Sequence, residues 1–413
     1  MHVAFFTNTY HPVVNGVVRS IHDFRYALTA HGHQVFVFAQ HVKNYKDKEP
    51  FIFRYPAFKW PTRQEYPLTI PLSPFVDWVL PSLKLDVIHS HHPVLIGNAA
   101  VHQSRQLDLP LVFTHHTRYK MYSHYVPLSS KLVETAIDQW LDDYMSKCHH
   151  IVVPSESVKQ VLVDEYGITS QITAVPTGLN LSLYERIDVQ AVRETKGWGQ
   201  DIVLVSVGRL AKEKNQEMLL KAVGHVMQTH ANVRLVLIGD GDESKSLQKL
   251  AKKLNIADRV EFTGNMPHED VIAHLKAADI FCFASVTETQ GLVTMEALAA
   301  GLPVVAVDAT GTRDVMDHDQ EGFLTANDSE ALAQAIEEVV SNRDLRERFK
   351  TAARKRAESL SIDAQAKKLV GVYEQAIGDH KAGRLVQVKR PKSKKKHWYQ
   401  AIDDWFEFER WAN

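Results

Sequence analysis

The chain has 413 residues, of which 45% are hydrophobic and 23% charged, and its formal net charge is −1 at pH 7. This length allows two domains that each bury a core, and the balanced charge excludes a global field that would recruit nucleic acid. The two cysteines, Cys148 and Cys282, form neither a disulfide framework nor a zinc spacing. No stretch reaches the roughly 18 apolar residues of a transmembrane helix, and the amino terminus does not resemble a signal peptide. We therefore expect a cytoplasmic two-domain α/β protein.

The amino-terminal part alternates short apolar strands with helices. An apolar run over 3–7 predicts a buried strand, followed by a loop with Asn15 and Gly16, a helix over 21–30 and a strand over 34–39. A strand, a glycine-bearing loop and a helix form half of a Rossmann unit, whose loop lies at the carboxyl end of the sheet. Taken alone, one glycine after a strand more often marks a plain βα turn.

Two later stretches are rich in aromatic residues. Residues 41–81 are irregular, and their Phe, Tyr and Trp side chains suit a protein core, an apolar acceptor or a bilayer. Tyrosines interleaved with Lys and Arg over 118–147 suit a membrane interface or an ordinary protein surface equally well.

Two predicted strands end in histidines. The strand at 85–89 runs into a histidine cluster that ends at His92, and the strand at 110–114 runs into His115 and His116. The first cluster lacks a carboxylate or thiolate at a metal-binding spacing. We therefore favour a loop that lines a cleft over a metal site.

The alternation breaks at 175–180 and restarts with a strand at 201–208. This strand runs into Arg209, and Lys214 follows five residues later. Arginine offers phosphate oxygens a bidentate fork and lysine a compact charge, so the pair suits a diphosphate. The alternative is a solvated basic turn.

A further strand at 278–285 delivers two carboxylates flanking a glycine. Glu288 precedes Gly291, and Glu296 opens a predicted helix that ends at Gly301. Gly291 allows close backbone approach, and a helix amino terminus suits phosphate or sugar oxygens. The two carboxylates can hold two separate sets of hydroxyls on one ligand. Alternatively, Glu288 caps the helix and Glu296 is a solvated helix residue.

The carboxyl-terminal tail departs from the rest in composition. Residues 384–396 include seven Lys or Arg, and an aromatic segment follows with apolar side chains on one helical face. Each basic residue near an anionic leaflet contributes about 1 kcal/mol, so the tail can recruit a membrane. The alternative is an apolar helix packed on its own domain behind a solvated linker. The membrane-binding residues predicted here are Lys394, Lys395, Lys396, Trp398 and Trp405.

The stretch from Glu288 to Glu296 resembles the E-x7-E motif of retaining GT-B glycosyltransferases of family GT4, and the similarity extends over roughly residues 1–375. The resemblance implies an α/β GT-B fold with two Rossmann-like domains facing across a cleft. It implies an acceptor-side domain at 1–178, a nucleotide-sugar domain at 179–361, a helix near 362–377 that returns to the first domain, and the tail at 380–413.

The resemblance also implies residue roles. Arg209 and Lys214 would stabilise the leaving diphosphate, Glu296 would hold ribose hydroxyls and Glu288 sugar hydroxyls. His116, with His115 as its rival, would hydrogen-bond a sugar hydroxyl near the reacting carbon. Gln290 stands where many members have Phe or Pro, which leaves the detail of sugar recognition open. The implied catalytic set is His116, Glu288, Arg209 and Lys214, and the implied donor-binding set is Asn15, Gly16, Arg209, Lys214, Gln290, Gly291, Leu292 and Glu296.

The implied activity is α-retaining transfer of a hexose from a nucleotide sugar, with UDP-glucose expected and no metal or other cofactor. The basic tail and the segment at 115–122 resemble diacylglycerol glucosyltransferases. We therefore expect a lipid acceptor such as diacylglycerol or a glycosyl-diacylglycerol, and peripheral association with the anionic inner face of the cell membrane. A soluble sugar or sugar-phosphate acceptor, and a non-catalytic GT-B scaffold, stay open as alternatives. A GT-B phosphorylase that uses pyridoxal phosphate is a further alternative, but the sequence shows no motif for the lysine that would form the Schiff base.

Overall fold

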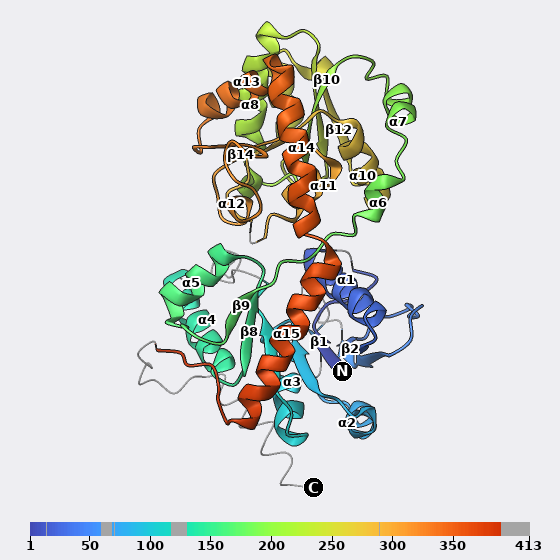
Figure 1. Ribbon diagram of the computed structural model, residues 1–413, viewed down its shortest axis with the longest axis vertical. Helices are drawn as coiled ribbons and strands as arrows, with labels where there is room; N and C mark the ends of the chain where they lie inside the picture. Colours follow the sequence, from blue (N-terminus) through green and yellow to red (C-terminus); the bar gives the residue numbers. More distant parts are fainter. Residues whose placement is uncertain (14, 59–67, 70, 117–129, 289, 390–413) are drawn as a thin grey trace. The chain divides into compact units, whose positions relative to one another are not determined.

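A computed structural model describes the chain except for residues 14, 59–67, 70, 117–129, 289 and 390–413. The chain forms two compact units (Figure 1). The first unit contains Met1–Val175 and the chain from Ala366 onward, and the second contains Pro176–Gln365. Within the described residues, no helix is both long and apolar enough to span a membrane.

The first unit is built on a seven-stranded sheet in which all neighbouring strands are parallel, in the order β3-β2-β1-β6-β7-β8-β9. The inner strands are buried along almost their whole length, as expected for a parallel sheet covered on both faces. A short antiparallel pair, β4 and β5, lies outside this sheet. The strands are β1 His2–Thr7, β2 Gln34–Gln40, β3 Ile52–Tyr55, β4 Ala57–Phe58, β5 Leu68–Thr69, β6 Val87–Ser90, β7 Leu111–Thr114, β8 His150–Val153 and β9 Ile172–Ala174.

Helices flank this sheet. The largest apolar cluster of the first unit joins one face of the sheet to α2, α3, α4 and α5. The helices are α1 Gly16–Ala30, α2 Pro74–Val79, α3 Ile96–Gln106, α4 Ser130–Met145, α5 Glu156–Tyr166 and α15 Ile362–Lys381, with a 3-10 turn at Leu80–Leu83. α15 begins in the second unit and continues in the first, where its Tyr373 hydroxyl lies 2.8 Å from Nδ1 of His89.

The chain after α15 continues along the first unit. Val386 is buried, and its backbone N–H donates to the carbonyl of Cys148 at 2.9 Å. The backbone N–H of Lys389 donates to the carbonyl of Tyr166 at 3.3 Å. Val386 therefore anchors residues 384–389 to the first unit, although Arg384 and Lys389 are exposed. The rest of the predicted tail, including Lys394, Lys395, Lys396, Trp398 and Trp405, lies outside the described residues.

The second unit has a six-stranded parallel sheet in the order β12-β11-β10-β13-β14-β15. The strand order reverses between β10 and β13, where ligands of doubly wound sheets bind beyond the carboxyl ends of the strands. The strands are β10 Ile202–Val207, β11 Val233–Ile238, β12 Val260–Gly264, β13 Ile280–Phe283, β14 Val304–Val307 and β15 Gly322–Thr325.

Two apolar clusters cover the two faces of this sheet. One contains α8, α9 and α13, and the other contains α10, α11 and α14, with α11 beside α14 (Figure 1). The helices are α6 Ser182–Glu185, α7 Val189–Lys196, α8 Gln216–Thr229, α9 Ser244–Lys253, α10 His268–Ala277, α11 Leu292–Ala300, α12 Thr312–Val315, α13 Ser329–Ser341 and α14 Arg343–Ser359, with 3-10 turns at Lys212–Lys214 and Ala257–Arg259. The two Rossmann-like halves confirm the predicted α/β fold class.

Two predicted helix starts are wrong. α1 begins at Gly16 instead of residue 21, because Asn15 caps it: its side-chain oxygen accepts from the backbone N–H of Val18 at 2.9 Å. α11 begins at Leu292 instead of Glu296, because Gly291 takes a left-handed conformation that sets the chain into the helix one residue later. Its predicted end at Gly301 is confirmed.

Candidate active site

The loop between β13 and α11 is fixed by two glycines that touch. Gly291 has φ 70°, and a Cβ added to it would lie 2.6 Å from the carbonyl oxygen of Gly311. Gly311 has φ 83°, and its Cβ would lie 2.9 Å from the carbonyl oxygen of Glu288. Real Cβ atoms do not approach oxygen this closely, so both positions require glycine. This contact sets where α11 begins and where Glu288 stands.

Glu288 and Lys214 form an ion pair at the carboxyl ends of neighbouring strands. Lys214 ends the 3-10 turn that follows β10, and Glu288 follows β13. The Ser285 hydroxyl also donates to Glu288 Oε1 at 3.1 Å. Both charged side chains are half-buried. The alternative in which Glu288 caps α11 is wrong, because the N-cap is Gly291.

Arg209 directly follows the Gly208 turn after β10 and forms an ion pair with Glu213. Its backbone is held from two sides. The Gln216 side chain donates to the Arg209 carbonyl at 2.9 Å. On the other side, Gly239 packs so closely on the residue before Arg209 that a Cβ on it would lie 2.1 Å from the carbonyl oxygen of Gly208. The Arg209 side chain itself is 55% exposed. A well-anchored backbone therefore presents a guanidinium that solvent and ligands can reach.

Glu296 is buried on α11 and has a partner that the sequence did not reveal. Its side chain is 3% exposed, so the alternative of a solvated helix residue is wrong. Nε2 of His268, the first residue of α10, donates to Glu296 Oε1 at 2.8 Å, and the His268 side chain is 40% exposed. A buried charge needs such a partner. The only signal in the sequence was that His268 follows a turn after a predicted strand.

Gln290 and Leu292 flank the motif glycine. The Gln290 side-chain amide donates to the carbonyl of Thr177 at 3.1 Å, which ties the loop to the segment that opens the second unit. Leu292 is the half-buried first residue of α11, whose first N–H groups have no acceptor within the helix.

In the first unit, His116 belongs to a histidine stack. Nε2 of His116 lies 3.0 Å from Nδ1 of His91, whose ring stacks on that of His89 with centroids 4.3 Å apart. Nε2 of His89 lies 2.6 Å from the Thr114 hydroxyl. His115 packs instead edge-on against Phe113, so His116 and not its rival joins the stack.

Burial keeps this stack neutral. It lowers the pKa of His89 to about 3, and it lowers the pKa values of His91 and His116 well below the ordinary 6.5, with the neighbouring histidines acting in the same direction on these two. A neutral imidazole can exchange hydrogen bonds with a hydroxyl but brings no charge. Nε2 of His91 is buried and has no hydrogen-bond partner among the described residues.

Asn15 and Gly16 occupy the start of α1 in the first unit. Asn15 is the helix cap, and a Cβ at Gly16 would meet no atom of the protein within 4 Å. Packing therefore gives no reason for glycine at this position.

Comparison with known proteins covers most of the chain. Residues 14–183 match the family model described as "Glycosyltransferase Family 4", and residues 188–356 match "Glycosyl transferases group 1". The alpha-monoglucosyldiacylglycerol synthase of Streptococcus pneumoniae is 28% identical over 84% of this chain and 80% of its own length. The enzyme of that name from Acholeplasma laidlawii is 29% identical over 84% of this chain and 89% of its own length.

Solved structures show the same fold. Sucrose-phosphate synthase from Thermosynechococcus elongatus has a TM-score of 0.74 at 21% identity, over 91% of this chain and 99% of its own. Anabaena HepE, solved in complex with UDP, has a TM-score of 0.72 at 19% identity, over 91% of this chain and 100% of its own. The two family models match consecutive parts of the chain and together cover most of it. The chain is therefore a glycosyltransferase of family 4 with the GT-B fold, and it resembles the diacylglycerol glucosyltransferases.

Proposed function

We propose that this glycosyltransferase moves glucose from UDP-glucose to a membrane lipid, such as diacylglycerol or a glycosyl-diacylglycerol, and retains the α configuration. The observation that carries the donor part is the group of Arg209, Lys214, Glu288 and Glu296 at the carboxyl ends of β10 and β13. The printed names of two relatives, alpha-monoglucosyldiacylglycerol synthases, favour glucose and the lipid acceptor.

Arg209 and Lys214 would bind the diphosphate. In the structure each is paired with a carboxylate, Arg209 with Glu213 and Lys214 with Glu288. Arriving phosphate oxygens would replace these carboxylates as partners of the two cations. The exchange would free Glu288 to accept hydrogen bonds from hydroxyls of the transferred sugar.

The same two cations would stabilise the charge that develops on the leaving diphosphate, which is the usual role of preorganised charge in group transfer. We propose that they do this without a metal ion. In a front-face reaction the β-phosphate would take the acceptor proton, so the reaction needs no carboxylate nucleophile.

Glu296 would hold the ribose hydroxyls. Its carboxylate accepts from the His268 ring, and carboxylate oxygens can accept several hydrogen bonds, as a ribose diol requires. The backbone N–H groups at Gly291 and Leu292 and the amide of Gln290 would provide further polar contacts. His116, kept neutral by burial, would exchange a hydrogen bond with a sugar hydroxyl.

Membrane association would use two surfaces. Around α2, Trp78 is 77% and Phe75 is 56% exposed, with ring centroids 6.3 Å apart, and amphipathic or apolar rings of this kind insert at membrane interfaces. The second surface would be the basic and aromatic tail, in which Lys394, Lys395 and Lys396 would attract an anionic inner leaflet.

The test is a product assay. The purified protein is incubated with labelled UDP-glucose and anionic liposomes containing diacylglycerol, and the lipid extract is analysed. We expect an α-linked glucolipid whose formation is lost in Lys214→Gln and kept in Lys221→Gln, because Lys221 is an exposed residue of α8 paired with Glu217. Donor hydrolysis without a lipid product would refute the acceptor. No turnover with any nucleotide sugar would refute the donor site.

The membrane part needs a truncation that leaves the first unit intact. Because Val386 is buried, the chain should be cut after Lys389 rather than at residue 384. We expect the truncated chain to bind soluble UDP unchanged and to sediment less with anionic liposomes. Equal sedimentation of both chains would remove the tail from the proposal and leave only the α2 surface.

A further inference from the structure

A pocket of about 880 Å³ lies in the second unit, away from the candidate active site. Ile202, Asp279 and Leu302, which line it, stand at or just before the first residues of β10, β13 and β14. The active-site residues follow the last residues of β10 and β13. Because these strands are parallel neighbours, the pocket lies at the amino ends and the candidate active site at the carboxyl ends of the same strands.

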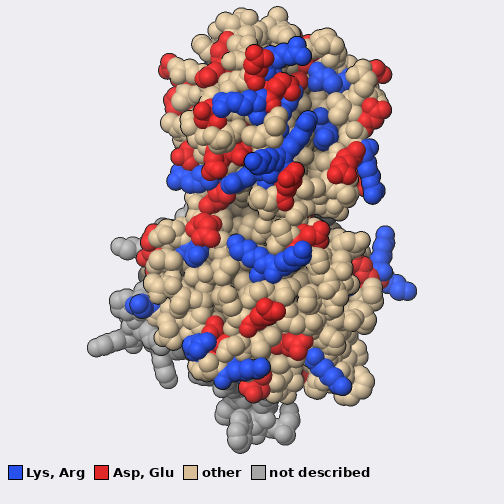
Figure 2. Space-filling view, in the orientation of Figure 1, with Lys and Arg blue, Asp and Glu red and all other residues tan. Residues whose placement is uncertain are grey.

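The pocket lining is basic. Its six cationic side chains outnumber three acidic ones. Figure 2 shows Lys and Arg side chains gathered over α14, the helix that contributes most of the cations. The cations are Arg193 from α7, Lys276 from α10 and Arg343, Arg346, Lys350 and Arg354 from α14.

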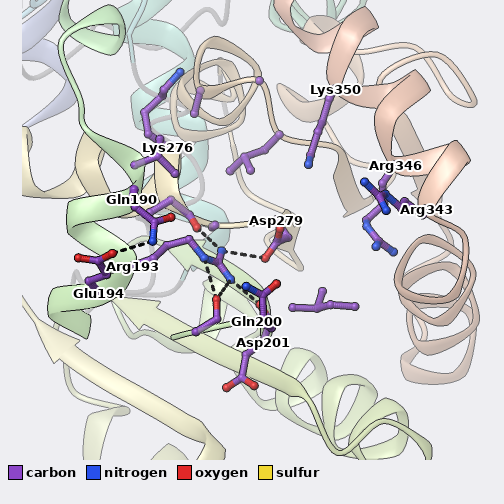
Figure 3. Close-up of a pocket in the computed structure, with 18 of the residues that line it drawn as sticks. Gln190, Arg193, Glu194, Gln200, Asp201, Lys276, Asp279, Arg343, Arg346 and Lys350 are labelled. Atoms are coloured by element: carbon purple, nitrogen blue, oxygen red, sulfur yellow. Dashed lines mark hydrogen bonds and ion pairs between the residues drawn. The ribbon is translucent and has the colours of Figure 1, made fainter. Parts of the chain in front are cut away.

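All three acids already have partners, and Figure 3 shows those of Asp279 and Glu194. Asp279 pairs with Arg193 at 3.2 Å. Asp201 pairs at 3.1 Å with Arg234, which does not line the pocket. Glu194 accepts from the Gln190 amide at 2.7 Å. These three carboxylates are thus engaged with other groups; beyond the lining, Glu185 acts electrostatically on Lys276, and Glu347 on Arg343 and Arg354, without forming an ion pair with them.

Half of the cations are also used structurally. Arg193 donates to the carbonyls of Ala277 and Asp201 at 2.7 and 2.6 Å. Arg346 donates to the carbonyl of Val339 at 2.8 Å, and Lys350 pairs with Glu347 at 3.0 Å.

The remaining cations, Lys276, Arg343 and Arg354, have no hydrogen bond or ion pair in the described part of the chain. Burial, and after it the nearby Arg354 guanidinium, lower the pKa of Lys276. Gly301 makes room for Arg354: a Cβ there would lie 2.7 Å from Arg354 Nε. Two like charges are thus held near each other beside a floor of small apolar residues that includes Ala278 and Ala300.

We propose that this pocket binds a phosphate-bearing ligand, with the phosphate on Lys276, Arg343 and Arg354 and the organic part on the apolar floor. An anion supplies what the cluster lacks, and arginine side chains suit phosphate oxygens through bidentate hydrogen bonds. The volume suits a small molecule, since such sites usually measure about 300–1,000 Å³. The ligand is either a free phosphorylated solute or the headgroup of a phospholipid.

The test uses the full-length chain and compares two double variants of equal charge. Lys276→Gln/Arg354→Gln removes two pocket cations. Lys249→Gln/Lys355→Gln removes two exposed lysines of the same unit that do not line the pocket. Calorimetric titration with inorganic pyrophosphate, at saturating UDP to occupy the donor site, measures the affinity of the pocket for a soluble phosphate ligand. Sedimentation with phosphatidylglycerol–phosphatidylcholine vesicles measures binding to phospholipid headgroups.

For a soluble ligand we expect pyrophosphate to bind the wild type and the control, and to bind the pocket variant at least about tenfold more weakly, since each hydrogen bond to a charged group contributes a factor of this order. For a headgroup, only vesicle sedimentation should fall in the pocket variant. Arg343→Gln, which leaves the Gly301 contact intact, should act in the same direction and guards against misfolding of the double variant. Equal behaviour of the two double variants in both measurements overturns the proposal.

Discussion

Replacing Gly291 by alanine tests whether the contact between the two loops positions the motif. The new Cβ would lie 2.6 Å from the carbonyl oxygen of Gly311, and the residue would have to keep φ 70°. Gly197 is a matched control. It has φ 64° and ends α7, but a Cβ there would meet nothing within 4 Å. The two alanine variants therefore share the backbone strain and differ in the clash.

The expected losses of stability follow from the backbone strain and the clash. A left-handed conformation costs a non-glycine residue about 1–2 kcal/mol, which is the expected destabilisation for Gly197→Ala. Overpacking adds about 1–3 kcal/mol, so Gly291→Ala should lose roughly 2–5 kcal/mol in total. Relief of the clash would move the Gly311 turn or the Glu288 loop. A misplacement approaching 1 Å costs about 100-fold in rate, so glycosyl transfer should fall by at least about tenfold.

Urea unfolding of both variants, followed by tryptophan fluorescence and by circular dichroism, measures the difference in the free energy of unfolding. Initial rates of glycosyl transfer measure the catalytic effect. Gly197→Ala should keep wild-type transfer. If the two variants unfold with free energies within about 0.5 kcal/mol of each other, the spread expected for independent sites, the loop contact does not constrain the motif and our reasoning is wrong.

Three further predictions concern single side chains. Lys214→Gln should lower kcat/KM for the nucleotide sugar by at least about 100-fold, as loss of one preorganised charge partner typically does, whereas Lys221→Gln should leave it unchanged; steady-state kinetics decides. His268→Ala should weaken UDP binding about tenfold by releasing Glu296, and His268→Gln, which keeps a donor, should restore part of it; equal affinities in calorimetry would contradict this positioning role. Burial lowers the pKa of His89 to about 3, so below pH 6.5 the unfolded chain binds one more proton than the folded chain at this residue. Its contribution to stability is therefore complete above pH 6.5 and falls on acidification by about 1.4 kcal/mol per pH unit. Denaturant unfolding at several pH values between 6.5 and 5 should therefore show a slope smaller by up to this amount in His89→Gln, while the other buried histidines keep their share.

The sequence predicted the fold through periodicity. Short apolar runs such as that at 3–7 are buried parallel strands. Helix starts were less predictable. The start of α11 depends on the left-handed Gly291, and that conformation is imposed by its contact with Gly311, a residue twenty positions away. Local propensity alone pointed to the alanine-rich run that begins at Glu296.

The site itself was only half visible in the sequence. Arginine and lysine after a strand indicate anion binding by their chemistry, and two acids around a glycine indicate a ligand with hydroxyls. Nothing in the spacing shows that Lys214 meets Glu288. That contact depends on β10 and β13 being neighbours in the sheet, although β11, β12 and the helices α8, α9 and α10 lie between them in the sequence.

The ion pairs that the sequence could not show also explain how the unliganded site stays stable. A half-buried Lys214 or Glu288 alone would lose hydration without compensation, and mutual pairing supplies it. A phosphate-bearing donor restores a partner to the lysine, and its sugar hydroxyls restore partners to the carboxylate. Binding then exchanges one satisfied arrangement for another, so the donor does not have to offset the cost of an uncompensated buried charge. The same logic distinguishes the pocket at the amino ends of the strands, where Lys276 and Arg354 lie near each other and neither forms an ion pair with a carboxylate in the described part of the chain. There an anion would add a partner instead of replacing one.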